Sequence, residues 1–483
     1  MPSLPTSRSP TGEPSQPIIR DGSPRFPIGA QIVVVGAGAC GCTAALAAHE
    51  GGAEVVILER DATPRGNTSL SGGQIPAAGT KLQRAAGVDD TPALLADDLI
   101  RKARGACDVA LARHIAAESA RTVDWLVEAH RLPLSCITDF IYPGHSRPHM
   151  HASPSRFGAE LLAVFLNAVA AAGIDLMTAA RVIGLFADTD DRILGVRVAR
   201  PDGRTEDIGC DALILACNGY GGNPSLLRRY IPEIAAAPYL GHDGNQGDAI
   251  IWGEALGASV KDLGAFQGHG AVCTPHMVQV GWPVFTEGGY QVNLAGQRFS
   301  NENAGYSEQA LNVLRQPEGI AWAIWDGRCE RVAAQMHSHQ VAASIGAIRR
   351  FDDTAGLAAA IGCPPVVLAE TVRAVEAMAR GAAPCPWGRD FTSKPPLQAP
   401  FFAARITGAL FHTQGGLEVD RRGRVLRPDG TAFPNLYAGG GAARGLSGPA
   451  DWGYLSGSGL LMAVNLGRLA GIAAAAQVGA ARA

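Results

Sequence analysis

The sequence predicts an α/β fold that is interrupted by a second, α+β domain. The first observation is the segment Gln31–Glu59, in which an apolar β-branched run, closely spaced glycines, an Ala-rich stretch and a second apolar run follow one another. The second is a change to mixed short strands and helices from about Phe266 to His412. After it, glycine-rich turns at Gly439–Gly441 and Gly457–Gly459 restore the earlier strand–turn–helix pattern. Strands alternating with helices predict a parallel sheet, and the interruption predicts an insertion.

The glycines of the first segment have the spacing GxGxxG. Gly36 permits a tight turn after the strand, Gly38 lets the backbone approach a pyrophosphate, and Gly41 lets the helix pack closely. Glu59 ends the second strand, about 20 residues further on, where an acid accepts a hydrogen bond from a ribose hydroxyl. Strand, glycine turn, helix and acid together predict a Rossmann-type dinucleotide site rather than a glycine-rich turn without a ligand.

Composition excludes several other classes of protein. The 483 residues predict two or three domains, and a hydrophobic content of 47% is enough for a full core. A net charge of −3 leaves no basic surface for nucleic acid. The 10 cysteines form neither a CxxC pair nor CxxCH, so no zinc ribbon or attached haem is encoded. The apolar stretch Leu460–Ala476 contains Asn465 and Arg468 and is short for a membrane span, so we expect a cytoplasmic protein.

The domain organisation follows from these patterns. Residues 1–26, rich in Ser, Pro and Arg and without an apolar core, predict a disordered tail and no signal peptide. Residues 27–265 and 413–483 are expected to form the dinucleotide-binding domain, and residues 266–412 the inserted domain. Within the first of these, Arg65–Thr80 is rich in Gly, Ser and Asn and predicts an irregular, ligand-facing loop.

Four segments resemble, in family order, the flavoproteins that include soluble fumarate reductases, the succinate dehydrogenase flavoprotein subunit and 3-ketosteroid Δ1-dehydrogenases. They are VVVGAGACG with ILER, GNTSLSGGQIPAAGT, GDAIIWGEALGASVKD, and HTQGGLEVD through LYAGGG to LSGSGLLMAVNLGRLAG. The resemblance spans nearly all of Gly29–Ala474. It implies a Rossmann-type FAD-binding domain with an inserted α+β substrate-capping domain, and FAD as the cofactor. No second GxGxxG follows a strand elsewhere to hold a nicotinamide.

The resemblance also implies which residues bind FAD. The loop from Asn67 to Gly73 would lie along the flavin and pyrophosphate, Asp248 on the ribityl or phosphate side, and the backbone of Val182 at the adenine. The start of the last helix would favour negative charge at flavin N1 and O2. Gly66 and Asn67 occupy the place of the histidine that is bonded to the flavin in membrane-bound members, so FAD is expected to be noncovalent. The full set is Gly36, Gly38, Gly41, Glu59, Arg60, Asn67, Thr68, Ser71, Gly72, Gly73, Val182, Asn218, Gly219, Asp248, Gly440, Gly441, Ser458, Gly459, Leu460 and Leu461.

Two tyrosines replace the arginines of fumarate reductases. In that group one arginine shortly after RF-x-NE donates a proton, and another in NRLGGNA binds a carboxylate. This chain has RFSNE at Arg298–Glu302, but Tyr306 and Tyr454 stand at the two arginine positions. Ketosteroid dehydrogenases also have two tyrosines: one takes the proton α to the carbonyl, and the other polarises that carbonyl together with a glycine N–H. Tyr306 and Tyr454 resemble these, with Gly457 as the N–H donor.

Several further side chains remain candidates for substrate contact. His269 and His412 match the substrate-binding histidines of fumarate reductases, which suggests an extra polar group, or a carboxylate beside a ketone; the alternative is a hydrogen-bonded core role for each. Tyr142 falls where ketosteroid enzymes have a helper tyrosine. The neighbouring Pro-rich loop contains three histidines without a carboxylate or cysteine at ligand spacing, so we expect substrate contact and no metal there. These are His145, His149 and His151.

The resulting hypothesis is an FAD-dependent dehydrogenase that desaturates the α,β bond next to a carbonyl, as in a cyclic ketone or a 3-ketosteroid-like substrate. Tyr454 and Gly457 would hold the carbonyl oxygen, Tyr306 would receive the α proton, and the β hydrogen would leave as hydride to flavin N5. An external electron acceptor would be needed. The alternative is an enoate reductase or polycarboxylate dehydrogenase that uses His269 and His412, and a third possibility is a flavin-binding protein without this chemistry.

Overall fold

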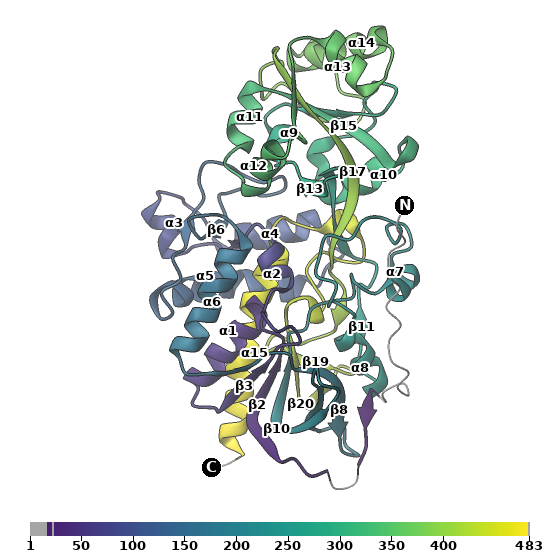
Figure 1. Ribbon diagram of the computed structural model, residues 1–483. Helices are drawn as coiled ribbons and strands as arrows, with labels where there is room; N and C mark the ends of the chain where they lie inside the picture. The colour runs from purple at the N-terminus through teal and green to yellow at the C-terminus, as the bar shows by residue number, and fades with distance from the viewer. Residues whose placement is uncertain (1–16, 22–23, 482–483) are drawn as a thin grey trace.

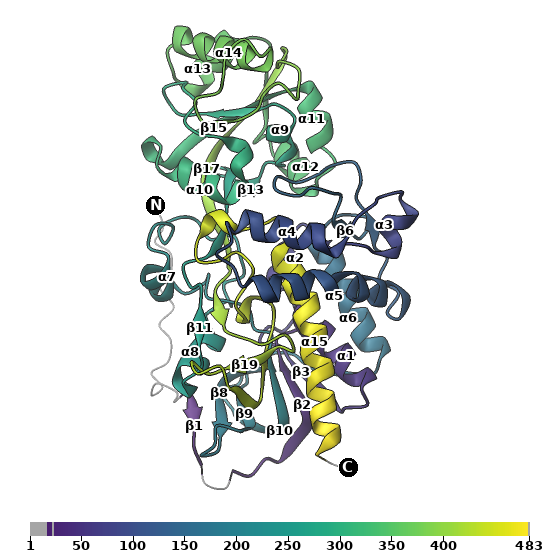
Figure 2. The same cartoon turned by 180° about the vertical axis from the view of Figure 1, so that it is seen from behind.

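The computed structural model describes residues 17–21 and 24–481 of the chain. Figures 1 and 2 show an elongated molecule with two parts: a larger one that contains both described ends of the chain, and a smaller one above it. The larger part is built on a nine-stranded sheet, and the smaller on a six-stranded sheet. The fold is thus a mixed α/β fold with a parallel core, as the sequence predicts.

The nine-stranded sheet has the order β1-β8-β9-β10-β2-β3-β7, and β20 pairs with both β10 and β19. Strands β10, β2, β3 and β7 are parallel, and β20 is parallel to β10. Ile32, Val33 and Val34 of β2 are 0% exposed because helices cover both faces of this parallel region. The strands are β1 (Ile18–Ile19), β2 (Ile28–Val35), β3 (Val55–Leu58), β7 (Asp175–Met177), β8 (Arg181–Ala187), β9 (Ile193–Ala199), β10 (Thr205–Leu215), β19 (Arg424–Leu426) and β20 (Ala432–Ala438).

Helices α1 (Ala39–Glu50) and α15 (Ser458–Ala480) lie side by side against this sheet (Figures 1 and 2). Their close approach requires glycine, because a Cβ at Gly467 would lie 2.5 Å from the carbonyl oxygen of Cys40. The sequence suggested a stretch too short for a membrane span, but α15 is 23 residues long and apolar enough to cross one. Of its most apolar window, 61% is buried inside the protein, as in the core helix of a globular fold.

Further helices and short strands complete the larger part. Their helices are α2 (Gly66–Leu70), α3 (Lys81–Ala85), α4 (Pro92–Lys102), α5 (Val109–Glu128), α6 (Gly158–Ala171), α7 (Pro224–Tyr230), α8 (Asp248–Leu256), η3 (Gly440–Ala442) and η4 (Asp451–Gly453). Their strands are β4 (Gln74–Pro76), β5 (Ser135–Cys136) and β6 (Met150–Ala152), which pair in the order β4-β6-β5, and β11 (Val260–Lys261), which pairs with β18 (Gly416–Leu417).

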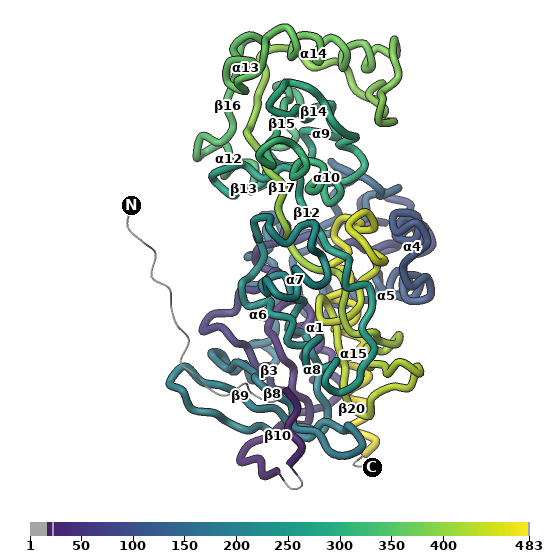
Figure 3. Tube along the Cα trace, turned by 90° about the vertical axis from the view of Figure 1, so that its right-hand side faces the viewer, coloured from purple at the N-terminus to yellow at the C-terminus, as the bar shows by residue number. Residues whose placement is uncertain are grey.

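The smaller part has an antiparallel sheet of order β13-β12-β17-β15-β14, with β16 on β17. Its long strands β12 and β17 run back into the larger part, as the trace in Figure 3 shows, so their lower ends reach the dinucleotide end of the first sheet. The strands are β12 (Phe266–Cys273), β13 (Val278–Gln279), β14 (Tyr290–Val292), β15 (Ile320–Asp326), β16 (Arg349–Phe351) and β17 (Phe401–Thr413). The helices are α9 (Pro283–Thr286), η1 (Glu302–Ala304), α10 (Tyr306–Leu314), η2 (Pro317–Gly319), α11 (Gly327–Ala333), α12 (His337–Ser344), α13 (Thr354–Ile361) and α14 (Pro365–Ala379).

Two expectations about irregular segments need correction. Part of the predicted tail is ordered: Ile18 pairs with Leu185 at the sheet edge, and the ring of Phe26 packs edge-on against Phe186 at 5.3 Å. These few apolar residues find buried partners despite the polar composition around them; residues 1–16 and 22–23 lie outside the described residues. Within Arg65–Thr80, the structure has the short helix α2 and strand β4 in place of a wholly irregular loop.

Candidate active site

A cavity of about 280 Å³ begins at the C-terminal ends of β2 and β3 and extends to the lower ends of β12 and β17. Ligands of open α/β folds bind at this edge of the sheet. One end of the cavity is lined by the glycine turn and Glu59, and the other by side chains from both parts of the molecule, including His269, Tyr306 and Tyr454. The cavity therefore has a dinucleotide end and a substrate end.

Glycine is required at the dinucleotide end. Gly36 has φ +108°, and a Cβ there would lie 2.6 Å from the carbonyl oxygen of Ala216. A Cβ at Gly41 would lie 1.8 Å from the carbonyl oxygen of Gly36. Helix α1 begins after Gly38, which gives no side-chain cap. The N–H of Ala39 donates to the hydroxyl of Thr68 at 3.0 Å, and the next N–H groups of the first turn can bind phosphate. Glu59 accepts a 2.9 Å hydrogen bond from the N–H of Ala37, at the end of β3.

The region expected to hold the flavin is also rich in donors. Helix α15 begins after Gly457, which has φ +78° and gives no side-chain cap. The hydroxyl of Ser458 is buried and has no hydrogen-bond partner within the described part of the chain. An uncapped helix start and an unpaired hydroxyl suit a ligand that carries negative charge, as flavin does at N1 and O2 once reduced. Asn67 is held by the backbone N–H of His242 at 2.8 Å and the side chain of Asn245 at 2.9 Å.

Most of the predicted FAD-binding residues line this cavity, together with all of the predicted catalytic residues: Tyr142, His269, Tyr306, His412, Tyr454 and Gly457. The structure does not bring every predicted residue to the surface of the cavity. Gly41, Gly73, Gly219, Ser458 and Leu461 lie behind it. Gly41 and Gly73 are kept from the cavity surface because they pack directly against backbone atoms of other segments. Leu461 is 0% exposed because its side chain points into the core.

Asp248 lies at the first turn of α8, after Gly247, which has φ +82°. Burial raises the pKa of Asp248, and the charges of Arg60 and Arg181 oppose that rise. The closest approach to Arg60 is 3.9 Å, between Nη1 and Oδ2. Asp248 is therefore a partly buried acid at the dinucleotide end, with two arginines nearby.

We expect FAD to leave the protein when acid or heat denatures it, because Gly66 and Asn67 replace the histidine that forms a covalent bond in membrane-bound relatives. His242 lies close to Asn67, but its Nε2 is held 2.7 Å from Oδ2 of Asp61. The measurement is the flavin absorbance of the supernatant after precipitation, compared with the pellet. Flavin that remains with the precipitated chain would contradict the expectation.

Aromatic rings surround Tyr306 at the substrate end. Its ring stacks on His269 at a centroid distance of 5.3 Å and lies 6.0 Å from the ring of Tyr454. The rings of Trp282 and Tyr142 lie 5.6 Å and 6.5 Å away. Tyr306 is the first residue of α10, directly after Gly305, which has φ +144°. This glycine lets the chain turn so that the phenol enters the cavity from the smaller part.

The two candidate catalytic phenols are hydrogen-bonded to each other. The Tyr306 hydroxyl donates to the oxygen of Tyr454, and the hydroxyl of Ser456 donates to Tyr306. The backbone N–H groups of Gly457 and Gly459 also approach the Tyr454 oxygen. Burial raises the pKa of Tyr306 well above its usual value, whereas the pKa of Tyr454 rises only to about 12 because its donors oppose the effect of burial.

The candidate histidines are neutral hydrogen-bond donors. Burial lowers the pKa of His269 to about 3 and that of His412 to about 4. Nδ1 of His269 accepts a hydrogen bond from the N–H of Ala271 at 3.2 Å. Nδ1 of His412 lies 2.8 Å from the amide nitrogen of Gln414, a donor, and 3.3 Å from the carbonyl oxygen of Thr413; the shorter contact makes this nitrogen an acceptor. The remaining proton of each neutral ring is therefore on Nε2. Each ring can offer a neutral N–H but no positive charge.

Sequence reasoning missed two polar groups in this region. Ser456 lies between Tyr454 and Gly457, and its hydroxyl bonds Tyr306. The indole N–H of Trp282 is buried at the cavity without a partner among the residues described. A polar residue flanked by two site residues was the available signal for Ser456; no sequence signal distinguished the Trp282 donor from a packing tryptophan.

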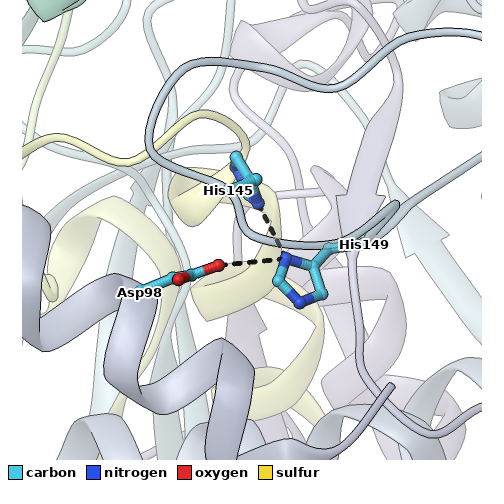
Figure 4. Close-up of side chains that lie close together, drawn as sticks. All are labelled: Asp98, His145 and His149. Carbon is cyan, nitrogen blue, oxygen red and sulfur yellow. Dashed lines mark hydrogen bonds and ion pairs between the residues drawn. The ribbon is translucent and has the colours of Figure 1, made fainter. Parts of the chain in front are cut away.

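The loop with three histidines also differs from its sequence prediction. A carboxylate is present, because Asp98 on α4 lies close to His145 and His149 (Figure 4). One ring nitrogen of each histidine and one carboxylate oxygen of Asp98 all lie within 4.8 Å of one another. Spacing could not reveal this contact because α4 and the loop are distant in sequence. The loop also does not line the cavity at these histidines; it lies behind Ser456, to which His145 is bonded.

Sequence comparisons support a dinucleotide-binding role for the cavity. The family model for the FAD binding domain matches residues 31–460. The chain is 27% identical over 441 residues to a probable fumarate reductase of Shewanella frigidimarina, covering 91% of this chain and 74% of that protein. It is 25% identical over 420 residues to a urocanate reductase of Eggerthella lenta, covering 85% and 69%.

Solved structures show the same fold. The open conformation of a flavocytochrome c3 fumarate reductase matches with a TM-score of 0.78 and 26% identity, over 94% of this chain and 79% of that one. The 3-ketosteroid-Δ4-(5α)-dehydrogenase of Rhodococcus jostii matches with a TM-score of 0.75 and 23% identity, over 93% and 98%. With the dinucleotide cradle and the uncapped helix start described above, these findings identify the chain as a member of the FAD-binding-domain family and as an FAD-dependent oxidoreductase of the fumarate reductase family.

Proposed function

We propose that this enzyme removes two hydrogens from the α,β carbon–carbon bond of a neutral carbonyl compound, such as a cyclic ketone. The observation that carries the proposal is the chemistry of the substrate end, where two hydrogen-bonded phenols and two neutral histidines stand in the positions expected to bind substrate. All four groups are neutral in their resting state. They suit a carbonyl oxygen better than a carboxylate.

The distribution of positive charge supports this substrate class. Among the described residues that line the cavity, Arg60 and Arg181 carry the permanent positive charges, and both stand at the dinucleotide end, after β3 and at the start of β8. A dicarboxylate at the substrate end would have to be buried without a charge-assisted partner. Such bonds are about twice as strong as neutral ones, and an unpaired buried charge is strongly unfavourable.

The carbonyl oxygen would accept hydrogen bonds from the Tyr454 hydroxyl and the N–H of Gly457. In the structure this N–H points at the Tyr454 oxygen, so the donors already converge on one small region. Donors that are fixed before the reaction stabilise the charge that develops on a carbonyl oxygen when the α carbon loses its proton. The two groups would therefore make the α hydrogen acidic.

Tyr306 would receive the α proton. It is itself protonated at neutral pH because burial raises its pKa, so it must pass its own proton on as it accepts another. The hydrogen bond from Tyr306 to Tyr454 supplies the route: Tyr306 gives its proton to Tyr454, and Tyr454 gives its own to the carbonyl oxygen. The product of this step is the enol. FAD, when bound, takes up the β hydrogen as hydride, and the enol proton is then released.

The direct test is anaerobic bleaching of the flavin by saturated compounds. Saturated cyclic ketones should bleach it, whereas succinate should not, because no cation is available for the carboxylates. Stopped-flow absorbance gives the rate for each compound at matched concentrations, and the flavin reduced by dithionite gives the end point. The proposal fails if succinate reduces the flavin faster than every ketone tested.

Substrate binding should be insensitive to pH between 5 and 8. His269 and His412 have pKa values lowered to about 3 and 4, so both remain neutral throughout this range. A site that used cationic histidines would instead lose affinity as pH rises through their usual pKa of about 6.5. The measurement is the KM of a reactive ketone at several pH values. A KM that rises about tenfold between pH 5.5 and 7.5 would contradict this expectation.

A further inference from the structure

A buried chain of polar side chains lies directly behind the peptide that joins Ser456 to Gly457. His145 is 3.1 Å from the Ser456 carbonyl oxygen through Nε2, and its Nδ1 is 2.9 Å from Nδ1 of His149 (Figure 4). On its other side, Nε2 of His149 is 3.2 Å from the carboxylate of Asp90. His145, His149 and Asp90 do not line the substrate cavity. Direct contact with substrate therefore does not explain why these polar side chains are buried here.

The partners of the outer nitrogens determine where the protons are. The Ser456 carbonyl and the Asp90 carboxylate can only accept, so Nε2 of His145 and Nε2 of His149 must both carry hydrogen. In two neutral rings the facing Nδ1 atoms would then both be lone pairs, at a distance of only 2.9 Å. Such a contact is repulsive. One additional proton between the two Nδ1 atoms converts it into a hydrogen bond of normal length.

The surrounding charges favour His149 as the ring that holds this proton. The carboxylates of Asp90 and Asp98 lie 3.2 Å and 3.7 Å from its ring, and the side chains of all three residues are 0–1% exposed. Arg101 bonds the other oxygen of Asp98, so one cationic histidine makes the cluster neutral overall. Burial, together with the neighbouring His149, lowers the pKa of His145 to about 3.

The remaining titratable neighbours add no charge. His151 contacts the carbonyl oxygens of Ile75 and His149 through Nδ1, and burial lowers its pKa to about 4. Burial raises the pKa of Cys136 to about 11, with the charge of Asp90 as a second cause. Both groups are therefore neutral between pH 6 and 9.

We infer that His149 is a buried imidazolium that acts through His145 to orient and polarise the Ser456–Gly457 peptide. In a trans peptide the C=O and N–H point in opposite directions, so fixing the Ser456 carbonyl against His145 aims the Gly457 N–H into the cavity. Hydrogen bonds in series strengthen one another, so the positive charge makes this N–H a better donor. The inference rests on the proposed function, in which that N–H holds the substrate's carbonyl oxygen. Asp90, His149 and His145 are positioning residues.

The protonation state can be measured without turnover. In the FAD-loaded enzyme carrying ¹⁵N-histidine, nuclear magnetic resonance at pH 8 should reveal one ring with both nitrogens protonated, and this signal should disappear in His149→Gln. His114→Gln is the matched control, because His114 also bonds a backbone carbonyl, that of Arg421 at 3.1 Å, away from the site. A spectrum in which His149 is singly protonated overturns the inference. So does a stoichiometric transition metal that is present in the wild type and lost in His149→Gln.

The effect on chemistry is tested with Asp90→Asn, which keeps an acceptor for His149 but removes the charge. Exchange of the ketone's α hydrogen with deuterated solvent should slow about tenfold, a smaller loss than removal of an oxyanion donor, while KM and FAD content stay unchanged. Asp326→Asn is the control, because Asp326 is also buried, at 5% exposure, but caps α11 in the other part of the molecule. Unchanged exchange in Asp90→Asn overturns the inference and leaves the proposed function intact. If no ketone exchanges in the wild type, the proposed function fails, and the histidine spectrum still decides the charge of His149.

Discussion

Tyr306→Phe should bind FAD and a saturated ketone normally and yet reduce the flavin at least about 100-fold more slowly than the wild type, the usual scale for loss of a general acid or base. The substitution removes the hydroxyl that would receive the α proton and that bonds Tyr454, while the ring and its packing on His269 remain. Because the lost interaction belongs to the transition state, kcat should fall and KM should not rise. Stopped-flow bleaching measures the rate, and absorbance of the purified protein measures FAD content.

Tyr290→Phe is the control for this substitution. Tyr290 is 1% exposed in the smaller part of the molecule, and its hydroxyl has no partner among the described residues, so its loss should change neither folding nor rate. Tyr142→Phe tests for a second base, because Tyr142 lies at the same cavity and burial raises its pKa to about 12. If Tyr306→Phe stays within a few-fold of the wild type while Tyr142→Phe loses activity, Tyr142 and not Tyr306 takes the proton.

The dinucleotide end was predictable because its chemistry depends on backbone conformation encoded in a short stretch of sequence. Gly36 and Gly41 stand where a Cβ would collide with backbone, and no distant residue is needed to infer this. The same holds for Glu59, whose position at the end of β3 follows from the length of one strand–helix–strand unit. Local rules therefore predicted the parallel core and its dinucleotide site, whereas FAD as the cofactor followed from the family resemblance.

The substrate end was predictable only in part. Tyr306 and Tyr454 could be found from short motifs, but their mutual hydrogen bond joins residues from two different parts of the molecule. The contacts of Asp90 and Asp98 with the histidine loop depend on how α4 packs, which no spacing in the sequence encodes. Side chains that meet only through tertiary packing thus remained hidden, including the acids that determine the charge of the histidine pair.

Tyr454→Phe should slow flavin reduction by about 10²–10³, the scale observed when one oxyanion-hole donor is removed. The hydroxyl is the proposed donor to the carbonyl oxygen and the middle member of the relay from Tyr306. The Gly457 N–H remains, so some polarisation of the carbonyl should persist. FAD content should be unchanged because the expected cofactor contacts of the α15 start come from its backbone and not from Tyr454, and flavin absorbance checks this.

Exchange of the α hydrogen with deuterated solvent in the fully reduced enzyme separates the roles of the two tyrosines, because hydride transfer to the flavin is then blocked and only proton transfer remains. Tyr306→Phe should abolish the exchange, since no group is left to take the proton. Tyr454→Phe removes the direct proton route from Tyr306, so the exchange should slow strongly. It should not be abolished, because the Ser456 hydroxyl still bonds Tyr306 and the Gly457 N–H still polarises the carbonyl. Mass spectrometry of the recovered ketone gives the rate. Wild-type exchange in Tyr306→Phe would mean that another residue is the base, and abolished exchange in Tyr454→Phe alone would assign the base to Tyr454.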